Sequence, residues 1–100
     1  MYQELIEKAW LNRELLKEES VKKAILEIID LLDKGEIRVA EKINNEWQVN
    51  QWVKKAIIMY FPLCETKDMQ AEDLKFWDKI PTKQNYNELQ IRCVPPAVAR

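Results

Sequence analysis

Apolar residues recur at intervals of three and four through the first third of the chain, which is the period of an amphipathic helix. This pattern predicts two helices, over about residues 2–17 and 20–34. Ser20 is a candidate N-cap for the second helix, and Gly35 follows it, where a glycine can take the left-handed conformation that ends a helix. We expect the two helices to form an αα-hairpin.

The pattern then changes, and β-branched residues alternate with charged ones over residues 37–49. Asn44-Asn45 lies in the middle, and asparagine tolerates the positive φ of a tight turn, so this stretch predicts a β-hairpin with a two-residue turn. That turn pairs Lys42 with Trp47. Both faces of the hairpin mix apolar and polar residues, so the sequence leaves open which face is buried.

A third helical stretch follows directly, over about residues 51–61, with Asn50 as its N-cap and Pro62 at its end. Its apolar positions again fall at helical spacing. Residues 62–75 show no period and are mostly polar, which predicts a loop.

Two short apolar stretches lie in the last quarter of the chain. Residues 76–80 predict a strand or extended segment that docks on the hairpin, and residues 89–94 predict a final extended piece before Pro95-Pro96, with a turn at 85–88 between them. Together the elements predict a single α+β domain over residues 1–100.

Composition narrows the class of protein. The chain is 47% hydrophobic, which is enough for a small core, and its formal net charge of −1 gives no reason to expect nucleic acid or an anionic membrane as partner. The first ten residues include acidic side chains and resemble no targeting peptide, so we expect a cytoplasmic protein. In that compartment Cys64 and Cys93 are expected as free thiols.

The inventory of reactive residues is thin. The absence of histidine excludes Ser-His and Cys-His nucleophiles and imidazole metal sites, and a single glycine excludes a phosphate-binding glycine loop. The seventeen carboxylates are interspersed with sixteen basic residues, which is typical of solvated helix faces. We therefore assign no catalytic residue and no metal ligand to these 100 residues.

Arg92 is the candidate binding residue. It lies in an extended segment between Ile91 and Cys93, and Pro95-Pro96 restricts the backbone just beyond it. A guanidinium held in this way suits a carboxylate, because its planar fork offers paired donors. The alternative is an ordinary surface or ion-paired arginine, which composition alone favours.

Other candidates are better explained structurally. Lys54 and Lys55 could contact an acidic ligand or a coenzyme phosphate, but they fit the solvated face of the third helix. Cys93 has no base beside it in the sequence and is expected to be an inert, buried thiol. The four tryptophans are expected to be core aromatics: Trp10, Trp47, Trp52 and Trp77.

Three segments carry a resemblance to a known family, and they occur in the same order with similar gaps. They are RVAEKINNEWQVNQWVKKA, FWDKIP and IRCVPPAVAR. Together they resemble the amino-terminal domain of the tetrahydrodipicolinate N-succinyltransferases, acyltransferases of lysine and diaminopimelate synthesis. The resemblance is close over residues 35–100 and weaker before that.

The resemblance implies an activity and a role for Arg92. In this family a succinyl group passes from succinyl-CoA to the amine of the ring-opened acceptor, and the arginine before the Val-Pro-Pro element binds an acceptor carboxylate. Arg92 is the matching residue; Arg100 also matches and is expected to be structural. Family members form trimers through a left-handed β-helix, which binds succinyl-CoA and is absent from residues 1–100.

The resulting hypothesis is an α+β domain that caps the acceptor site of a succinyltransferase and does not catalyse alone. No cofactor is expected to bind these residues, and trimer formation is expected only together with the β-helix. The alternative is a small noncatalytic module that binds a partner protein through exposed apolar residues.

Overall fold

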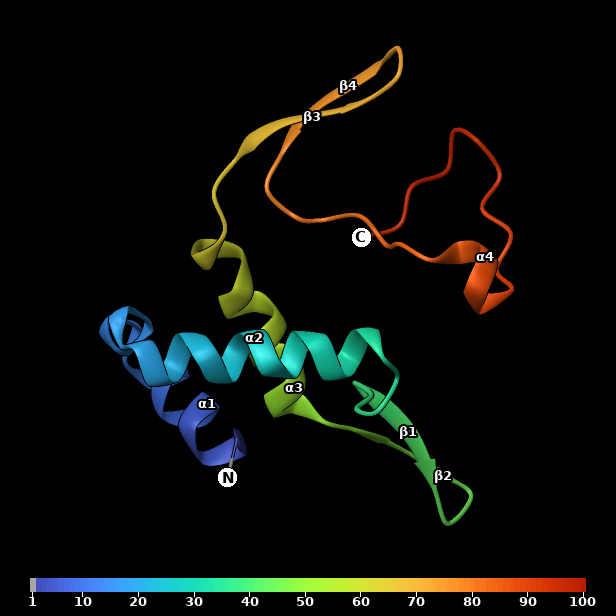
Figure 1. Cartoon of the computed structure of the whole chain (residues 1–100). Coiled ribbons are helices and arrows are strands. Elements are labelled where there is room, and N and C mark those ends of the chain that lie inside the picture. Colours follow the sequence, from blue (N-terminus) through green and yellow to red (C-terminus); the bar gives the residue numbers. More distant parts are fainter. Residues whose placement is uncertain (1) are drawn as a thin grey trace. The chain divides into compact units, whose positions relative to one another are not determined.

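The protein is described by a computed structural model over residues 2–100, and its fold is α+β with three main helices and two β-hairpins (Figure 1). The chain forms two compact units, and the boundary between them falls between Leu63 and Cys64. We call the segment up to Leu63 unit 1 and the segment from Cys64 to Arg100 unit 2.

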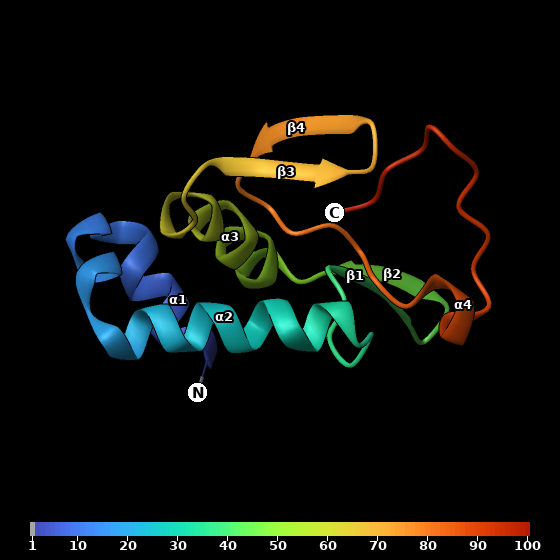
Figure 2. The ribbon, with the colours of Figure 1, turned by 45° about the horizontal axis from the view of Figure 1, so that its top comes forward.

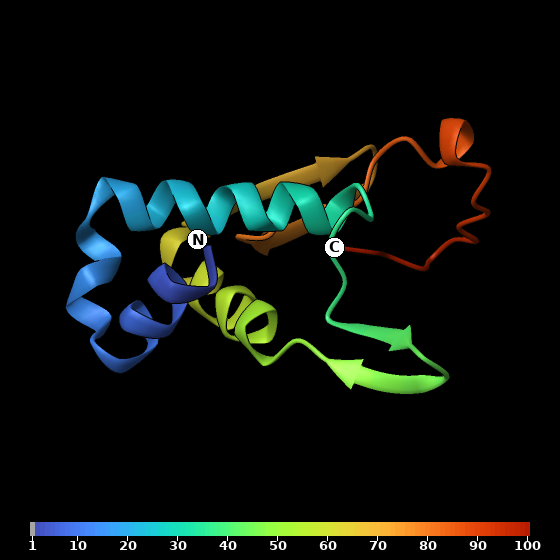
Figure 3. The same cartoon turned by 90° about the horizontal axis from the view of Figure 1, so that it is seen from below.

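Three helices make up most of unit 1: α1 (Tyr2–Leu11), α2 (Glu19–Asp33) and α3 (Gln51–Tyr60). Figures 2 and 3 show α1 and α3 on the same side of α2. Each of the three contacts the other two.

The first predicted helix is interrupted. It was expected over residues 2–17, but α1 ends at Leu11 and a short 3₁₀ helix, η1 (Arg13–Lys17), follows. Asn12 separates them in an extended conformation, and its side-chain oxygen accepts a hydrogen bond from the Glu14 backbone N–H over 3.3 Å. An asparagine that bonds its own backbone in this way competes with helix continuation.

The start of α2 corrects a second prediction. Ser20 was expected as the N-cap, but Glu18 holds that position and Ser20 lies inside the helix. The end of α2 confirms the role of Gly35, which has a φ of 77°. Gly35 N–H donates to Leu32 O (3.1 Å) and Glu36 N–H donates to Leu31 O (2.9 Å), which together form a Schellman motif.

The first hairpin has the predicted turn and register. Strands β1 (Ala40–Ile43) and β2 (Glu46–Val49) are antiparallel, Lys42 is opposite Trp47, and Asn44-Asn45 has φ values of 53° and 65°. The open question about its faces has an unexpected answer, because neither face is buried and Trp47 is 72% exposed.

Asn50 joins this hairpin to α3. It occupies the predicted N-cap position, but its side chain makes no capping bond. Its amide instead donates to the Arg38 carbonyl over 2.7 Å and approaches a Glu41 carboxylate oxygen at 3.4 Å, while its backbone N–H donates to Val39 O over 2.7 Å. Asn50 therefore holds both ends of the hairpin together.

The hydrophobic core lies between the three helices of unit 1. Seven buried side chains form its main cluster, and Trp10 and Trp52 pack against them, as predicted: Ile6, Ala9, Val21, Ile25, Ile28, Ala56 and Met59. Tyr2 adds a polar link between α1 and α2, because its hydroxyl donates to Glu27 over 2.5 Å. This hydrogen bond raises the pKa of Tyr2 above its usual value.

Unit 2 contains a second hairpin where a loop was predicted. The prediction of a loop over 62–75 is wrong, because 3₁₀ helix η2 (Phe61–Leu63) is followed by strands β3 (Lys67–Ala71) and β4 (Leu74–Asp78). The strands pair with each other in a sheet separate from β1–β2. Of the strand predicted at 76–80, residues 76–78 lie in β4, and they pair with β3 and not with the first hairpin.

The rest of unit 2 is mostly irregular. The predicted turn at 85–88 is a single helical turn, α4 (Tyr86–Leu89), and the predicted extended piece at 89–94 pairs with no strand among residues 2–100. Trp77 is 74% exposed, so the prediction that all four tryptophans are core aromatics is wrong for Trp47 and Trp77. None of the helices described is long and apolar enough to cross a membrane.

Candidate functional site

The segment that carries Arg92 is fixed on both sides by backbone hydrogen bonds. On one side, Ile91 N–H donates to Tyr86 O over 2.9 Å, which ties the segment to α4. On the other side, Ala97 N–H donates to Val94 O over 2.8 Å and closes a turn around Pro95-Pro96, whose peptide bond is cis. Arg92 therefore lies on an irregular segment between two anchored points.

Two further contacts hold this turn. The Cys93 thiol donates to Ala97 O over 3.5 Å, and Lys83 N–H donates to Ala99 O over 2.7 Å. The second bond joins the end of the chain to the stretch before α4. These hydrogen bonds therefore fix the turn that contains Pro95-Pro96 to other residues of unit 2.

The Arg92 side chain itself is exposed and forms no hydrogen bond or ion pair with any of residues 2–100. The alternative of an ion-paired arginine therefore finds no partner in the part of the chain that the structure describes, whereas the alternative of an ordinary surface arginine also fits this exposure. An unpaired guanidinium keeps its donors available for an external carboxylate.

Arg100 has a different environment. Its guanidinium forms an ion pair with Asp78 at the end of β4, so the charge is neutralised within unit 2. The Lys79 backbone N–H and the Arg100 guanidinium together hold the pKa of the Asp78 carboxyl below its usual value. This contact gives Arg100 a structural role, as expected from the sequence.

A pocket of about 170 Å³ lies beside this ion pair, in unit 2. Its apolar walls come from Met69, Phe76, Ile80 and Val98, and Asp78 and Arg100 also line it. Arg92 is not among the lining residues. The pocket and the free guanidinium are therefore two separate features of unit 2.

The cysteines do not form a reactive site. Cys64 and Cys93 are both free thiols, as predicted, and both are half-buried. Partial burial raises the pKa of Tyr86, and a hydrogen bond with the Cys93 thiol raises it further. Cys93 thus has hydrogen-bonding partners in Ala97 and Tyr86. Within residues 2–100, no three metal-ligating side chains cluster.

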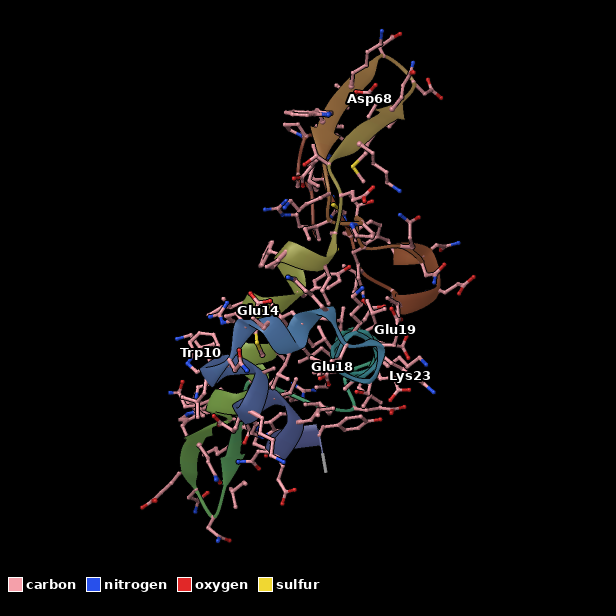
Figure 4. The ribbon with its side chains drawn as sticks, turned by 90° about the vertical axis from the view of Figure 1, so that its left-hand side faces the viewer. Trp10, Glu14, Glu18, Glu19, Lys23 and Asp68 are labelled. Atoms are coloured by element: carbon pink, nitrogen blue, oxygen red, sulfur yellow. The ribbon has the colours of Figure 1, made fainter. Side chains whose placement is uncertain are left out.

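Lys55 has a structural contact, but it is half-buried and does not lie on the fully solvated helix face expected from the sequence. Its ammonium pairs with Glu7 of α1 over 2.7 Å and lies 5.7 Å from the centre of the Trp10 ring. Arg13 covers the same ring at 4.4 Å. Trp10 lies near the junction of α1 and η1 (Figure 4). Lys54 is exposed, as expected from the sequence.

The sequence analysis did not predict this cluster of Trp10 with Glu7, Arg13 and Lys55. The Arg13 contact has the helical spacing of three residues, which offered a signal. The Glu7–Lys55 pair joins residues 48 positions apart, so no local sequence pattern indicated it.

Comparison with known proteins identifies the family. Residues 1–63 match the family model described as tetrahydrodipicolinate N-succinyltransferase N-terminal. This match ends where unit 1 ends.

Curated relatives match unit 2 as well. The chain is 43% identical over 108 aligned residues to 2,3,4,5-tetrahydropyridine-2,6-dicarboxylate N-succinyltransferase of Aeromonas salmonicida, covering 98% of this chain and 39% of the relative. The enzyme of the same name from Tolumonas auensis is 40% identical with the same coverage. That of a Psychrobacter species is 47% identical over 89 residues, 82% of this chain and 33% of the relative. The chain thus spans about two fifths or less of the length of these relatives.

Proposed function

Because this chain belongs to the tetrahydrodipicolinate N-succinyltransferase family, we propose that it is the amino-terminal domain of a cytoplasmic acyltransferase of lysine and diaminopimelate synthesis. The reaction transfers a succinyl group from succinyl-CoA to the amine of ring-opened tetrahydrodipicolinate. The amine attacks the thioester carbonyl, loses a proton, and the coenzyme thiol leaves. The role of this chain is to bind the acceptor.

The observation that carries this proposal is the free guanidinium of Arg92. The relatives are named for a 2,6-dicarboxylate substrate, and such an acceptor brings two negative charges that need cationic partners. Arg92 is exposed, has no partner among residues 2–100, and lies on a segment anchored at both sides. A bidentate bond from Arg92 to one carboxylate would orient the acceptor for attack.

Positioning alone does not supply the thioester site. We assign the binding of succinyl-CoA, the removal of the proton and the formation of a trimer to polypeptide corresponding to the remaining length of the relatives. Residues 1–100 by themselves are then expected to show no succinyl transfer, and measurable turnover by this chain alone would contradict that assignment.

The experiment uses a chimera in which residues 1–100 replace the matching region of the Aeromonas salmonicida relative. We expect Arg92→Ala to lower kcat/KM for the acceptor by about 10- to 150-fold, which corresponds to the loss of one charge-assisted hydrogen bond of about 1.5–3 kcal/mol. The KM for succinyl-CoA should not change, because Arg92 is assigned to the acceptor.

The matched control is Arg38→Ala, which removes another exposed arginine from unit 1 and should leave both substrates unaffected. Arg92→Lys should recover only part of the activity, because an ammonium keeps the charge and loses the planar fork. An active chimera with the same acceptor kinetics before and after Arg92→Ala would remove Arg92 from the acceptor site.

A further inference from the structure

Unit 2 exposes an unusual amount of apolar surface for its size. Across residues 64–100, all of which the structure describes, Ile80 is the one buried apolar side chain. Seven large apolar side chains of the same unit are between 45% and 74% exposed: Leu74, Phe76, Trp77, Leu89, Ile91, Val94 and Val98.

A segment of this kind is too small to be stable through its own core. Below about 40 residues, a domain usually needs a disulfide, a metal or a partner. Cys64 and Cys93 are free thiols, and residues 2–100 hold no cluster of metal ligands. Hairpin β3–β4 has only two strands, and an isolated two-stranded hairpin is marginally stable in water. Because unit 2 has neither a disulfide nor a cluster of metal ligands, a partner surface is the remaining way to stabilise it.

The pattern of β3–β4 shows which face that surface would cover. Met69 is opposite Phe76 and Ala71 is opposite Leu74, so these four residues share one face of the hairpin, while Asp68 and Trp77 share the other. Asp68 is labelled on this hairpin in Figure 4. Lys67 and Asp78, which are opposite each other, lie at one end of the first face; the rest of that face is apolar and leads into the pocket at Ile80 and Val98.

The pocket suits a side chain better than a small ligand. Its volume of about 170 Å³ is below the roughly 300–1,000 Å³ typical of small-molecule sites. The only charges lining it, Asp78 and Arg100, neutralise each other. Gln70 and Thr82 are its uncharged polar lining residues. A pocket with mainly apolar walls, whose two charges neutralise each other, is complementary to a protruding apolar side chain.

We propose that this apolar face of β3–β4, with its pocket, docks on the polypeptide that the relatives carry outside the matched region, and that an apolar side chain of that polypeptide fills the pocket. This inference rests on the proposed function. The match covers 39% of the Aeromonas salmonicida relative, so most of that protein is available as the occupant. Because Arg92 belongs to the same unit, docking would also order the segment that presents it to the acceptor.

Hydrogen exchange in the chimera tests the docking directly. The reporters are the Lys83 and Ala97 amides, which donate to Ala99 and Val94 within unit 2. We expect both to exchange at least about 100-fold more slowly in the chimera than in residues 1–100 alone, because docking suppresses local opening of unit 2. Phe76→Asp should abolish this protection by placing a charge in the apolar contact.

The matched control is Leu26→Asp, since Leu26 on α2 in unit 1 is 52% exposed, compared with 45% for Phe76. It should leave the protection of unit 2 unchanged. Phe76→Asp should also lower kcat/KM of the chimera at least about tenfold, because Arg92 would be held less well.

Three results would overturn the docking. Full protection in the chain alone would mean that this chain already covers the face, and protection that rises with the concentration of the chain alone would assign the face to a second copy. Unchanged protection and activity in Phe76→Asp would remove the face from any contact. Because the last result can be read in a chimera whose Arg92→Ala variant is impaired, the docking can fail while the proposed function stands.

Discussion

The two units of this chain differ in how much apolar surface they bury. Unit 1 holds nine buried apolar residues among those described, packed between three helices, whereas unit 2 holds one. Yet the free guanidinium of Arg92 and the apolar pocket both belong to unit 2. The family model matches the well-packed unit, whereas the relatives match both units.

The largest expected effect tests whether the core of unit 1 carries the stability. Ile28 is fully buried in α2, and Ile28→Ala should lower the free energy of unfolding by about 2–5 kcal/mol through lost burial and a residual cavity. Urea unfolding followed by helical circular dichroism measures it. In the isolated chain, Phe76→Ala in unit 2 should cost less than about 1 kcal/mol, because Phe76 remains 45% exposed.

A similar loss of unfolding free energy for Ile28→Ala and Phe76→Ala would contradict this contrast between the two units. It would mean that unit 2 already packs as tightly in solution as unit 1. Leu26→Ala on the outer face of α2 serves as control, because Leu26 is 52% exposed and should tolerate truncation.

A smaller loss of unfolding free energy is expected at Gly35, which ends α2. Gly35 has a φ of 77° and open space around its missing Cβ, so the cost of Gly35→Ala comes from the backbone conformation and not from a clash. We expect a loss of about 1–2 kcal/mol in the same unfolding assay. Gly35→Asn should lose less, since asparagine tolerates the left-handed region; equal losses would point to a packing role for this position.

The contrast between the units also explains which predictions from the sequence were right. Local signals are strong in unit 1: Gly35 ends a helix, and Asn44-Asn45 makes the turn of a hairpin with the correct register. In unit 2 the strand Lys67–Ala71 is mostly polar, and Glu72 takes the positive φ of 54° at the turn, where glycine or asparagine is the usual signal. The hairpin was therefore mistaken for a loop.

Burial could not be predicted from residue type alone. Trp10 and Trp52 pack on the core and Trp47 and Trp77 do not, because burial depends on which elements meet and not on the hydrophobicity of one side chain. Arg92 was selected as a candidate because the diproline after it marks a restricted backbone and because the surrounding motif resembles a family; its role stays a prediction. The Asp78–Arg100 pair joins residues 22 positions apart and left no local signal.

That ion pair provides the smallest expected effect and a test confined to unit 2. Asp78 has a lowered pKa in the folded protein, so its contribution to stability is present above the unfolded value of 3.8 and is lost as the pH falls through the lower, folded value. The backbone N–H of Lys79 is the main cause and Arg100 a lesser one. Arg100→Gln should therefore raise the pKa of Asp78 only part of the way back, as measured by carboxyl NMR titration.

A complete return of the Asp78 pKa to its ordinary value would assign the whole shift to Arg100. No change in the pKa would mean that the ion pair does not persist in solution. The pocket would then be lined by two independent charges. The second outcome would also weaken the case for an apolar occupant, because the fit of an uncharged side chain depends on those charges being neutralised.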